Sequence, residues 1–251
     1  MTAETPHALK AYSDLLIKVV TNTIYEDGRQ EPWSNGKFDP NARVDGRDWP
    51  SKAHTMIGTK RLESLRDMVT SVLEEDVPGD FIETGVWRGG ACILMRGLLE
   101  AYGDKTRKVF VADSFEGLPK PDPEKYPEDS GDKHSTFPEL AISLEEVQQN
   151  FAQYDLLDDQ VVFKKGWFKD TLPSLKDRKF SIIRLDGDMY ESTMDAFNNL
   201  YDGLSSGGYC IIDDYGAVEA CKKAVTDFRR DNNINAPLNQ IDWTGYWWRK
   251  P

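Results

Sequence analysis

The sequence predicts an α/β fold in which helices cover both faces of a doubly wound, mostly parallel sheet. Short apolar segments that suit buried strands alternate with stretches of helical periodicity over most of the chain. Two strand-like runs near the C-terminus, 238–242 and 246–249, flank a hairpin turn at 243–245 and would add an antiparallel strand. No repeat, low-complexity stretch or linker divides the chain, so we expect one domain over residues 1–251.

Residues 1–75 are predicted to form a helical cap on this domain. Apolar side chains recur at helical spacing over 8–24 and again over 55–73, and a Pro-Gly pair soon after ends the second pattern. The polar stretch 25–51 between them combines aromatic residues with turn formers. We interpret that stretch as an ordered loop.

The first strand and the turn after it indicate a nucleotide-like cofactor. A strand over 80–84, a glycine-bearing turn over 85–90 and a helix form the first unit of a nucleotide-binding sheet. The glycine spacing is not that of dinucleotide folds, and Glu83 would repel a pyrophosphate. Asp113 ends the next strand, 108–113, where an acid can accept hydrogen bonds from ribose hydroxyls. Together these features favour an adenosyl cofactor without phosphates.

Residues 117–142 interrupt the alternation of strands and helices. This segment holds five prolines and shows no periodicity. Loops of this length in compact domains are usually lids or disordered, and we interpret this one as a lid over the second substrate, with a solvated loop as the alternative. Within it, His134 is more simply a solvent-exposed loop residue than an acceptor contact. Farther on, 166–168 (Gly-Trp-Phe) follows a short strand and either packs against a flat ring or belongs to the core.

Two buried strands each end in a pair of aspartates. Asp186 and Asp188 follow the apolar run 180–185, and Asp213 and Asp214 follow the next such run. Parallel strands present their carboxyl ends at one sheet edge, where ligands of such sheets bind, so the four carboxylates should converge. An all-oxygen set without His or Cys favours Mg²⁺ or Ca²⁺, with Mn²⁺ as a further candidate, over zinc.

The plainer alternative for these acids is structural. They could cap loops or pair with basic residues such as Arg184 or Lys165. If they act in catalysis, a divalent ion held by three carboxylates would lower the pKa of a substrate hydroxyl, and a further carboxylate would take its proton. The sulfonium methyl of S-adenosylmethionine is an electrophile that such an alkoxide could attack.

The composition narrows the class of partner. The net charge is −12 at pH 7, and no basic cluster offsets it, which argues against a nucleic acid or an anionic membrane. No apolar run is long enough to span a bilayer, and the N-terminal segment does not resemble a signal peptide. The three cysteines lack Cys-x-x-Cys spacing, so neither a disulfide framework nor a structural zinc is expected. A cytoplasmic location is the resulting expectation.

Taken together, the motifs resemble those of the macrocin O-methyltransferase (TylF-type) family, over nearly the whole chain from about residue 25 to 249. Members of that family are metal- and S-adenosylmethionine-dependent enzymes that methylate sugar hydroxyls of natural products such as macrolide and aminocoumarin antibiotics. The resemblance is carried by Glu83-Thr-Gly-Val-Trp-Arg-Gly-Gly90, Ala112-Asp-Ser-Phe-Glu-Gly117, Gly166-Trp-Phe-Lys-Asp170, Leu185-Asp-Gly-Asp188 and Ile212-Asp-Asp-Tyr215.

The resemblance implies a class I methyltransferase fold and a role for each motif. Asp186, Asp213 and Asp214 would bind Mg²⁺, and Asp188 would be the general base. Acceptor contacts would come from the lid and from residues near Thr244. A homo-oligomer, a dimer or tetramer formed through the N-terminal helices and the lid region, is also implied. The residues expected to hold S-adenosylmethionine are Met56, Glu83, Thr84, Gly85, Asp113, Ser114, Gly166, Trp167 and Phe168.

The acceptor implied is a glycosylated small molecule, and three alternatives stay open. The enzyme could methylate another hydroxyl, such as that of a catechol, because seven tryptophans and the lid aromatics would accommodate a flat acceptor. A nicotinamide-dependent oxidoreductase fits the fold but not the glycine spacing. A non-catalytic binding protein would leave four convergent aspartates without a use.

Overall fold

The computed structural model describes residues 6–251 and contains a seven-stranded sheet with the order β3-β2-β1-β4-β5-β7-β6. The pairs from β3 to β5 are parallel, whereas β7 runs antiparallel to both β5 and β6. The predicted mostly parallel sheet and its C-terminal hairpin are thus confirmed. The strands are β1 (Asp80–Thr84), β2 (Val109–Asp113), β3 (Val161–Lys165), β4 (Phe180–Leu185), β5 (Leu204–Ile212), β6 (Asn239–Gln240) and β7 (Tyr246–Arg249).

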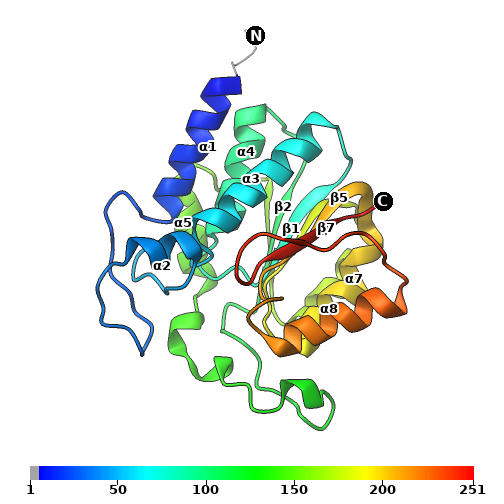
Figure 1. The fold of residues 1–251 in the computed structure, drawn as a ribbon. Helices are drawn as coiled ribbons and strands as arrows, with labels where there is room; N and C mark the ends of the chain where they lie inside the picture. The colour runs from blue at the N-terminus through cyan, green and yellow to red at the C-terminus, as the bar shows by residue number, and fades with distance from the viewer. Residues whose placement is uncertain (1–5) are drawn as a thin grey trace.

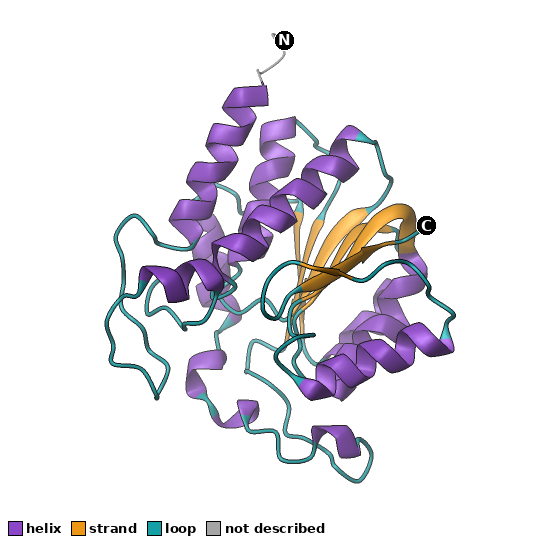
Figure 2. Cartoon of the chain, in the orientation of Figure 1, coloured by secondary structure: helices purple, strands orange, loops and turns teal. Residues whose placement is uncertain are grey.

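Helices cover both faces of this sheet, as predicted (Figures 1 and 2). Successive residues of a strand point to opposite faces, so Phe81 packs in one core and Ile82 in the other. None of the described helices is long and apolar enough to cross a membrane. One face carries α1 (Pro6–Val20), α3 (Gly58–Glu74), α4 (Gly90–Tyr102) and α5 (Leu144–Gln153), and the other carries α6 (Phe168–Thr171), α7 (Tyr190–Leu200) and α8 (Glu219–Asp231).

The order of the strands creates a topological switch point between β1 and β4. The chain proceeds from β1 to β2 and β3 on one side, then returns to form β4 and β5 on the other. Ligands of open α/β sheets bind beyond the carboxyl ends of the strands at such a point. The loops after β1 and β4 approach closely there, since a Cβ added at Gly85 (φ 85°) would lie 1.6 Å from the carbonyl oxygen of Asp186. Only glycine fits at this position.

The segment between α1 and α3 is held by a buried arginine. Arg43 donates through Nη1 to Asp27 and through Nε to Asp48, each at 2.8 Å. The same segment binds the turn after β1, because the Gly90 N–H donates to the carbonyl oxygen of His54 at 2.8 Å. The segment between α1 and α3 therefore lies beside the carboxyl end of β1.

A short helix, α2 (Pro40–Asp45), lies in this segment, where the sequence predicted only a loop. The side chain of Asp39 accepts hydrogen bonds from the N–H groups of Asn41 and Ala42, and proline occupies the first turn. An Asp-Pro pair is a helix-start signal that could have identified α2.

The boundary between α7 and β5 also differs from the prediction. Helical periodicity in the sequence predicts a helix over 193–204, ended by the Gly207-Gly208 pair. In the structure α7 begins earlier, at Tyr190, and ends at Leu200, and β5 already starts at Leu204. Gly207 (φ 83°) lies inside β5, where the β4–β5 register shifts, and so does not terminate a helix. A glycine at a strand irregularity gives the same local signal as one at a helix end.

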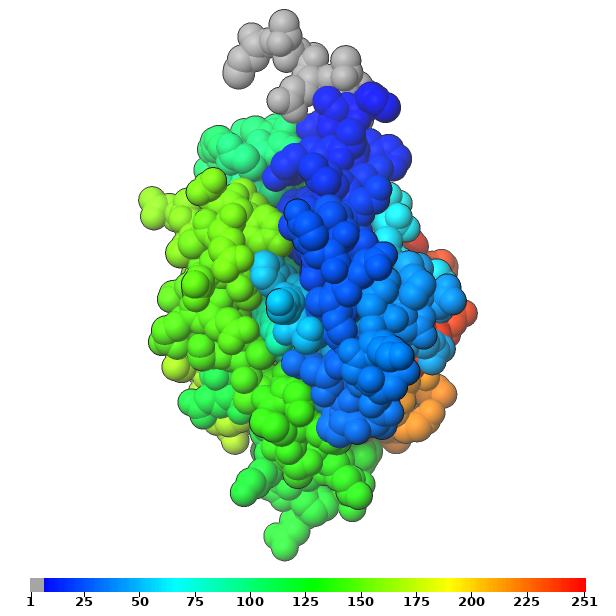
Figure 3. Space-filling model, turned by 90° about the vertical axis from the view of Figure 1, so that its left-hand side faces the viewer, coloured from blue at the N-terminus to red at the C-terminus, as the bar shows by residue number. Residues whose placement is uncertain are grey.

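Residues 117–142, referred to below as the lid, lie beyond the carboxyl edge of the sheet (Figures 1 and 2). The lid contains three short 3₁₀ turns, at Pro127–Asp129, His134–Thr136 and Pro138–Leu140. It adjoins the segment between α1 and α3 (Figure 3), where the ring of Phe137 lies 5.8 Å from that of Trp33 and 5.3 Å from that of Trp49.

Candidate active site

A cleft opens at the switch point and contains most of the side chains predicted to bind the cofactor. Together with the open space at its mouth it encloses about 980 Å³. Thr84 and Gly166 do not line it, although the carbonyl oxygen of Thr84 accepts from the N–H of Asp186 at 2.9 Å. The predicted residues that line the cleft are Met56, Glu83, Gly85, Asp113, Ser114, Trp167, Phe168, Asp186 and Asp188.

Asp113 is held in one orientation at the end of β2. One carboxylate oxygen accepts from the N–H of Val86 at 2.8 Å and the other from the N–H of Phe115 at 2.7 Å. Burial raises the pKa of Asp113, although these hydrogen bonds oppose the rise. Each oxygen keeps a further lone pair, so the carboxylate can still accept hydrogen bonds from a ligand in the cleft.

Glu83, in contrast, is bound on both oxygens within the protein. Arg184 donates to Oε1 at 2.5 Å, and the thiol of Cys92 donates to Oε2 at 2.9 Å. Glu83 is 2 % exposed, and burial raises its pKa while Arg184 opposes that rise. This carboxylate borders the cleft but is more deeply buried than that of Asp113, so a ligand reaches it less easily.

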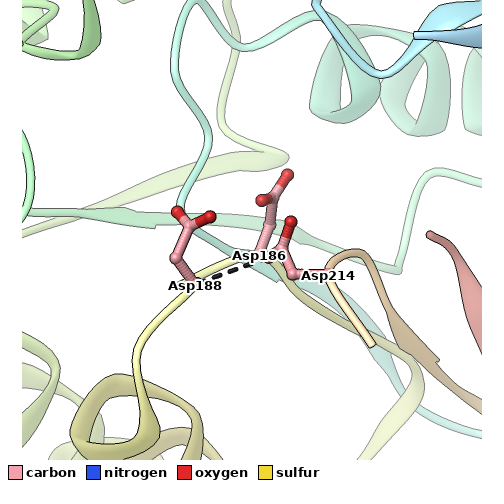
Figure 4. Close-up of side chains that lie close together, drawn as sticks. All are labelled: Asp186, Asp188 and Asp214. Carbon is pink, nitrogen blue, oxygen red and sulfur yellow. Dashed lines mark hydrogen bonds between the residues drawn. The ribbon is translucent and has the colours of Figure 1, made fainter. Parts of the chain in front are cut away.

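Three of the four predicted aspartates converge. One carboxylate oxygen from each of Asp186, Asp188 and Asp214 lies within 4.8 Å of the others, and Figure 4 shows the three side chains together. Because β4 ends at Leu185, Asp186 and Asp188 both belong to the loop beyond it. The N–H of Asp188 donates to Oδ2 of Asp214 at 3.3 Å, which ties this loop to the end of β5.

Asp213 is buried and does not belong to this group. Arg184 and Arg61 each form an ion pair with one of its oxygens. Arg184 also donates to Asp186 at 2.7 Å, which confirms the structural alternative for these two acids in part. Arg61, from α3, further pairs with Asp242 of the C-terminal hairpin at 3.1 Å. Neither this pair nor the contact of Arg61 with Asp213 has a signal in the sequence.

The cluster of Asp186, Asp188 and Asp214 carries more negative charge than its surroundings neutralise. Burial raises the pKa of Asp186 well above its ordinary value, and the charge of Asp213 adds to the rise. Burial also raises the pKa of Asp214, with Asp188 and Asp186 adding to it, and brings that of Asp188 to about 6. A cation bound among these oxygens would offset both the burial of the carboxylates and their mutual repulsion. Hard oxygen donors of this kind suit Mg²⁺.

His134 does not lie free in solvent as the sequence suggested. Its Nδ1 lies 2.6 Å from Oδ2 of Asp132, and its side chain is 32 % exposed. The hydrogen bond to Asp132 raises the pKa of His134 to about 8, and the nearby charge of Asp188 contributes to this rise. The charge of this lid residue therefore interacts with that of Asp188.

The family model described as "Macrocin-O-methyltransferase (TylF)" matches residues 7–250. The chain belongs to the macrocin O-methyltransferase family. It is 51 % identical to the 8-demethyl-8-(2,3-dimethoxy-alpha-L-rhamnosyl)-tetracenomycin-C 4'-O-methyltransferase of Streptomyces olivaceus, over 98 % of this chain and 94 % of the relative. It is 48 % identical to the demethyldecarbamoylnovobiocin O-methyltransferase of Streptomyces niveus, over 98 % and 96 %.

A solved structure agrees with this membership. The O-methyltransferase NovP superimposes with a TM-score of 0.91 at 48 % identity, over 96 % of this chain and 99 % of that one. The protein is therefore an O-methyltransferase, and it has the class I methyltransferase fold that the sequence predicted.

Proposed function

We propose that this enzyme transfers the methyl group of S-adenosylmethionine to a sugar hydroxyl of a glycosylated natural product, with Mg²⁺ bound at the acidic cluster. The observation that carries the proposal is the position of that cluster beside the cleft that holds the predicted cofactor residues. The Streptomyces olivaceus relative is named as a 4'-O-methyltransferase of a rhamnosyl-bearing tetracenomycin C, which supports a deoxysugar acceptor.

The residues of the cleft fit a nucleoside cofactor with a cationic sulfur. Asp113 has lone pairs for ribose hydroxyls, and the rings of Trp167 and Phe168 form an apolar wall against which a flat base can pack. No lysine-bearing phosphate loop is present at the turn after β1, which argues against a nucleotide with phosphates. S-adenosylmethionine would supply an electrophilic methyl group.

Asp186 and Asp214 are the proposed metal ligands, because an oxygen of each converges in the cluster and because burial and the neighbouring carboxylates raise the pKa of both. Asp213, the third ligand that the resemblance implies, could join them only if one of its oxygens left Arg61 or Arg184. When bound, the Mg²⁺ ion would polarise the acceptor hydroxyl and lower its pKa.

Asp188 is the proposed general base. It lines the cleft, and it is ionised at neutral pH both with the raised pKa of about 6 and with the lower pKa that a neighbouring cation would give it. It would accept the acceptor's proton through a carboxylate oxygen that faces the cleft. The lid residues that line the cleft, Gly117, Leu118, Pro119 and Leu140, would help to exclude water from the alkoxide.

We further propose that the enzyme forms a homo-oligomer through its N-terminal helices. Tyr12, Leu15 and Val19 are 39 %, 55 % and 39 % exposed, and their spacing places them on one face of α1. Light scattering of the purified protein would give the mass in solution, and a monomer at micromolar concentration would contradict this part of the proposal.

An acceptor screen tests the proposed reaction. The enzyme is incubated with S-adenosylmethionine, Mg²⁺ and a panel of rhamnosylated or otherwise glycosylated polyketides and aminocoumarins, with their aglycones and simple catechols as controls. We expect a mass gain of one methylene group on a glycoside and NMR assignment of the new methyl to a sugar oxygen. Methylation of catechols or aglycones alone would support the alternative acceptor class.

A further inference from the structure

A lid residue caps the helix that follows the acidic loop. The carboxylate of Asp129 accepts from the N–H of Tyr190 at 2.6 Å and from the N–H of Glu191 at 3.0 Å. These are the first two residues of α7, and Met189, the residue at its N-cap position, provides no side-chain acceptor. Asp129 is 1 % exposed. A cap that most helices take from an adjacent residue is here supplied from 61 residues earlier in the chain.

The turn that directly precedes α7 has a constrained backbone conformation. Asp188 has a φ of 55°, in the left-handed region that residues other than glycine adopt at a cost. The N–H of Met189 bonds to the carbonyl oxygen of Gly187 at 2.5 Å, so the chain reverses within three residues. On one side the turn is held by Asp214, which accepts from the N–H of Asp188. On its other side the turn is held by the buried side chain of Met189, by the N–H of Thr193, which donates to the carbonyl oxygen of Met189 at 3.0 Å, and by the Asp129 cap.

Other contacts place this part of the lid against the same helix. The rings of Tyr126 and Tyr190 lie 6.2 Å apart, and the turn at Pro127–Asp129 packs on both α7 and α8. The neighbouring Glu128, in contrast, is exposed. Asp129 is therefore the residue of this turn that carries a specific buried interaction.

We infer that Asp129 is a positioning residue for methyl transfer: through its cap on α7 the lid holds the backbone turn that sets Asp188. When the lid lies over an acceptor, the same contact then also orients Asp188. This inference rests on the proposed role of Asp188 as the general base.

The test compares Asp129→Ala, Asp129→Asn and the matched control Glu128→Ala, which removes the same charge from the same turn. In the ligand-free protein we expect Asp129→Ala to speed amide hydrogen exchange at Tyr190 and Glu191 by about three- to thirty-fold, the range typical of a lost helix cap. Asn is itself a good cap, so Asp129→Asn should keep most of the protection, and Glu128→Ala should match the wild type.

Kinetics separate positioning from mere stability. At a temperature where all variants are folded, we expect Asp129→Ala to lower kcat by about tenfold or more, with affinity for S-adenosylmethionine within about twofold and partial recovery in Asp129→Asn. Faster exchange throughout the chain, or faster exchange at α7 with an unchanged kcat, would overturn the inference. A wild-type protein without methyl transfer would instead contradict the proposed function, and amide exchange would still decide whether Asp129 caps α7.

Discussion

Arg184 and Asp213 form an ion pair inside the protein, directly behind the acidic cluster. The same guanidinium binds Glu83 at 2.5 Å and Asp186 at 2.7 Å, so one arginine joins carboxylates from the ends of β1, β4 and β5. Arg184 is 1 % exposed. The planar guanidinium binds these carboxylates with two nitrogens, because Nη1 donates to Glu83 and Asp186 while Nη2 donates to Asp213.

Removal of Arg184 should therefore be costly. We expect Arg184→Met to lower the free energy of unfolding by about 3–5 kcal/mol, because it leaves several buried carboxylates without a counter-charge. Arg184→Lys should recover only part of this loss. Urea denaturation measures the change, with Arg178→Met as the control: Arg178 is 46 % exposed on its side chain, and we expect it to contribute about 1 kcal/mol or less. A fully stable Arg184→Met protein would show that the carboxylates need no arginine.

Replacement of Asp188 separates a base from a ligand. Asp188→Asn keeps the shape of the side chain but removes proton-accepting capacity, so we expect turnover to fall by about 10²–10⁴-fold. Affinities for S-adenosylmethionine and Mg²⁺, measured by calorimetry, should stay within about tenfold of the wild type. Because an oxygen of Asp188 lies within 4.8 Å of oxygens of Asp186 and Asp214, a loss of Mg²⁺ binding would instead identify Asp188 as a ligand.

The two adjacent aspartates after β5 should respond differently to the same change. Asp214→Asn removes a converging oxygen and should weaken Mg²⁺ binding by at least about tenfold. Asp213→Asn leaves Arg61 and Arg184 without their shared partner, so its main effect should be a loss of about 3 kcal/mol in unfolding free energy. Calorimetry and urea denaturation of both variants distinguish the effects. Loss of Mg²⁺ affinity in a fully stable Asp213→Asn protein would show that Asp213 is primarily a ligand.

The His134–Asp132 pair should make stability depend on pH. The pKa of His134 is raised from 6.5 to about 8, so its stabilising effect is complete below pH 6.5 and is lost as the pH rises through 8. For this partly exposed pair we expect about 1 kcal/mol after screening by water. The measurement is the difference in unfolding free energy between wild type and His134→Gln at about pH 6 and about pH 9. Other groups that titrate over this range are present in both proteins and cancel in the comparison. A difference that does not change with pH would contradict the prediction.

The fold was predictable because its signals are local. Buried strands such as 180–185 and the helices between them have distinct hydrophobic periods, and acids at strand ends mark one edge of a parallel sheet whatever the detailed packing. The sequence could therefore place Asp186, Asp188 and Asp214 at one edge before their distances were known.

The pairing of charges within the site was not predictable in the same way. Arg61 meets Asp213 across 152 residues, and Asp129 meets Tyr190 across 61, and no periodicity specifies either contact. Asp213 and Asp214 are adjacent in the chain, yet one faces two arginines and the other faces the cluster. Which of two neighbouring aspartates faces a ligand depends on how the strand ends, and that is set by tertiary packing.

The most direct test of the account is the metal dependence of methyl transfer to a sugar. The enzyme is stripped with EDTA, dialysed, and assayed by mass spectrometry with S-adenosylmethionine and a glycosylated acceptor, without added metal and then with Mg²⁺ restored. We expect the methylated glycoside to disappear on stripping and to return with Mg²⁺, while Asp188→Asn stays inactive in both conditions. Full activity after exhaustive removal of metal would contradict this expectation.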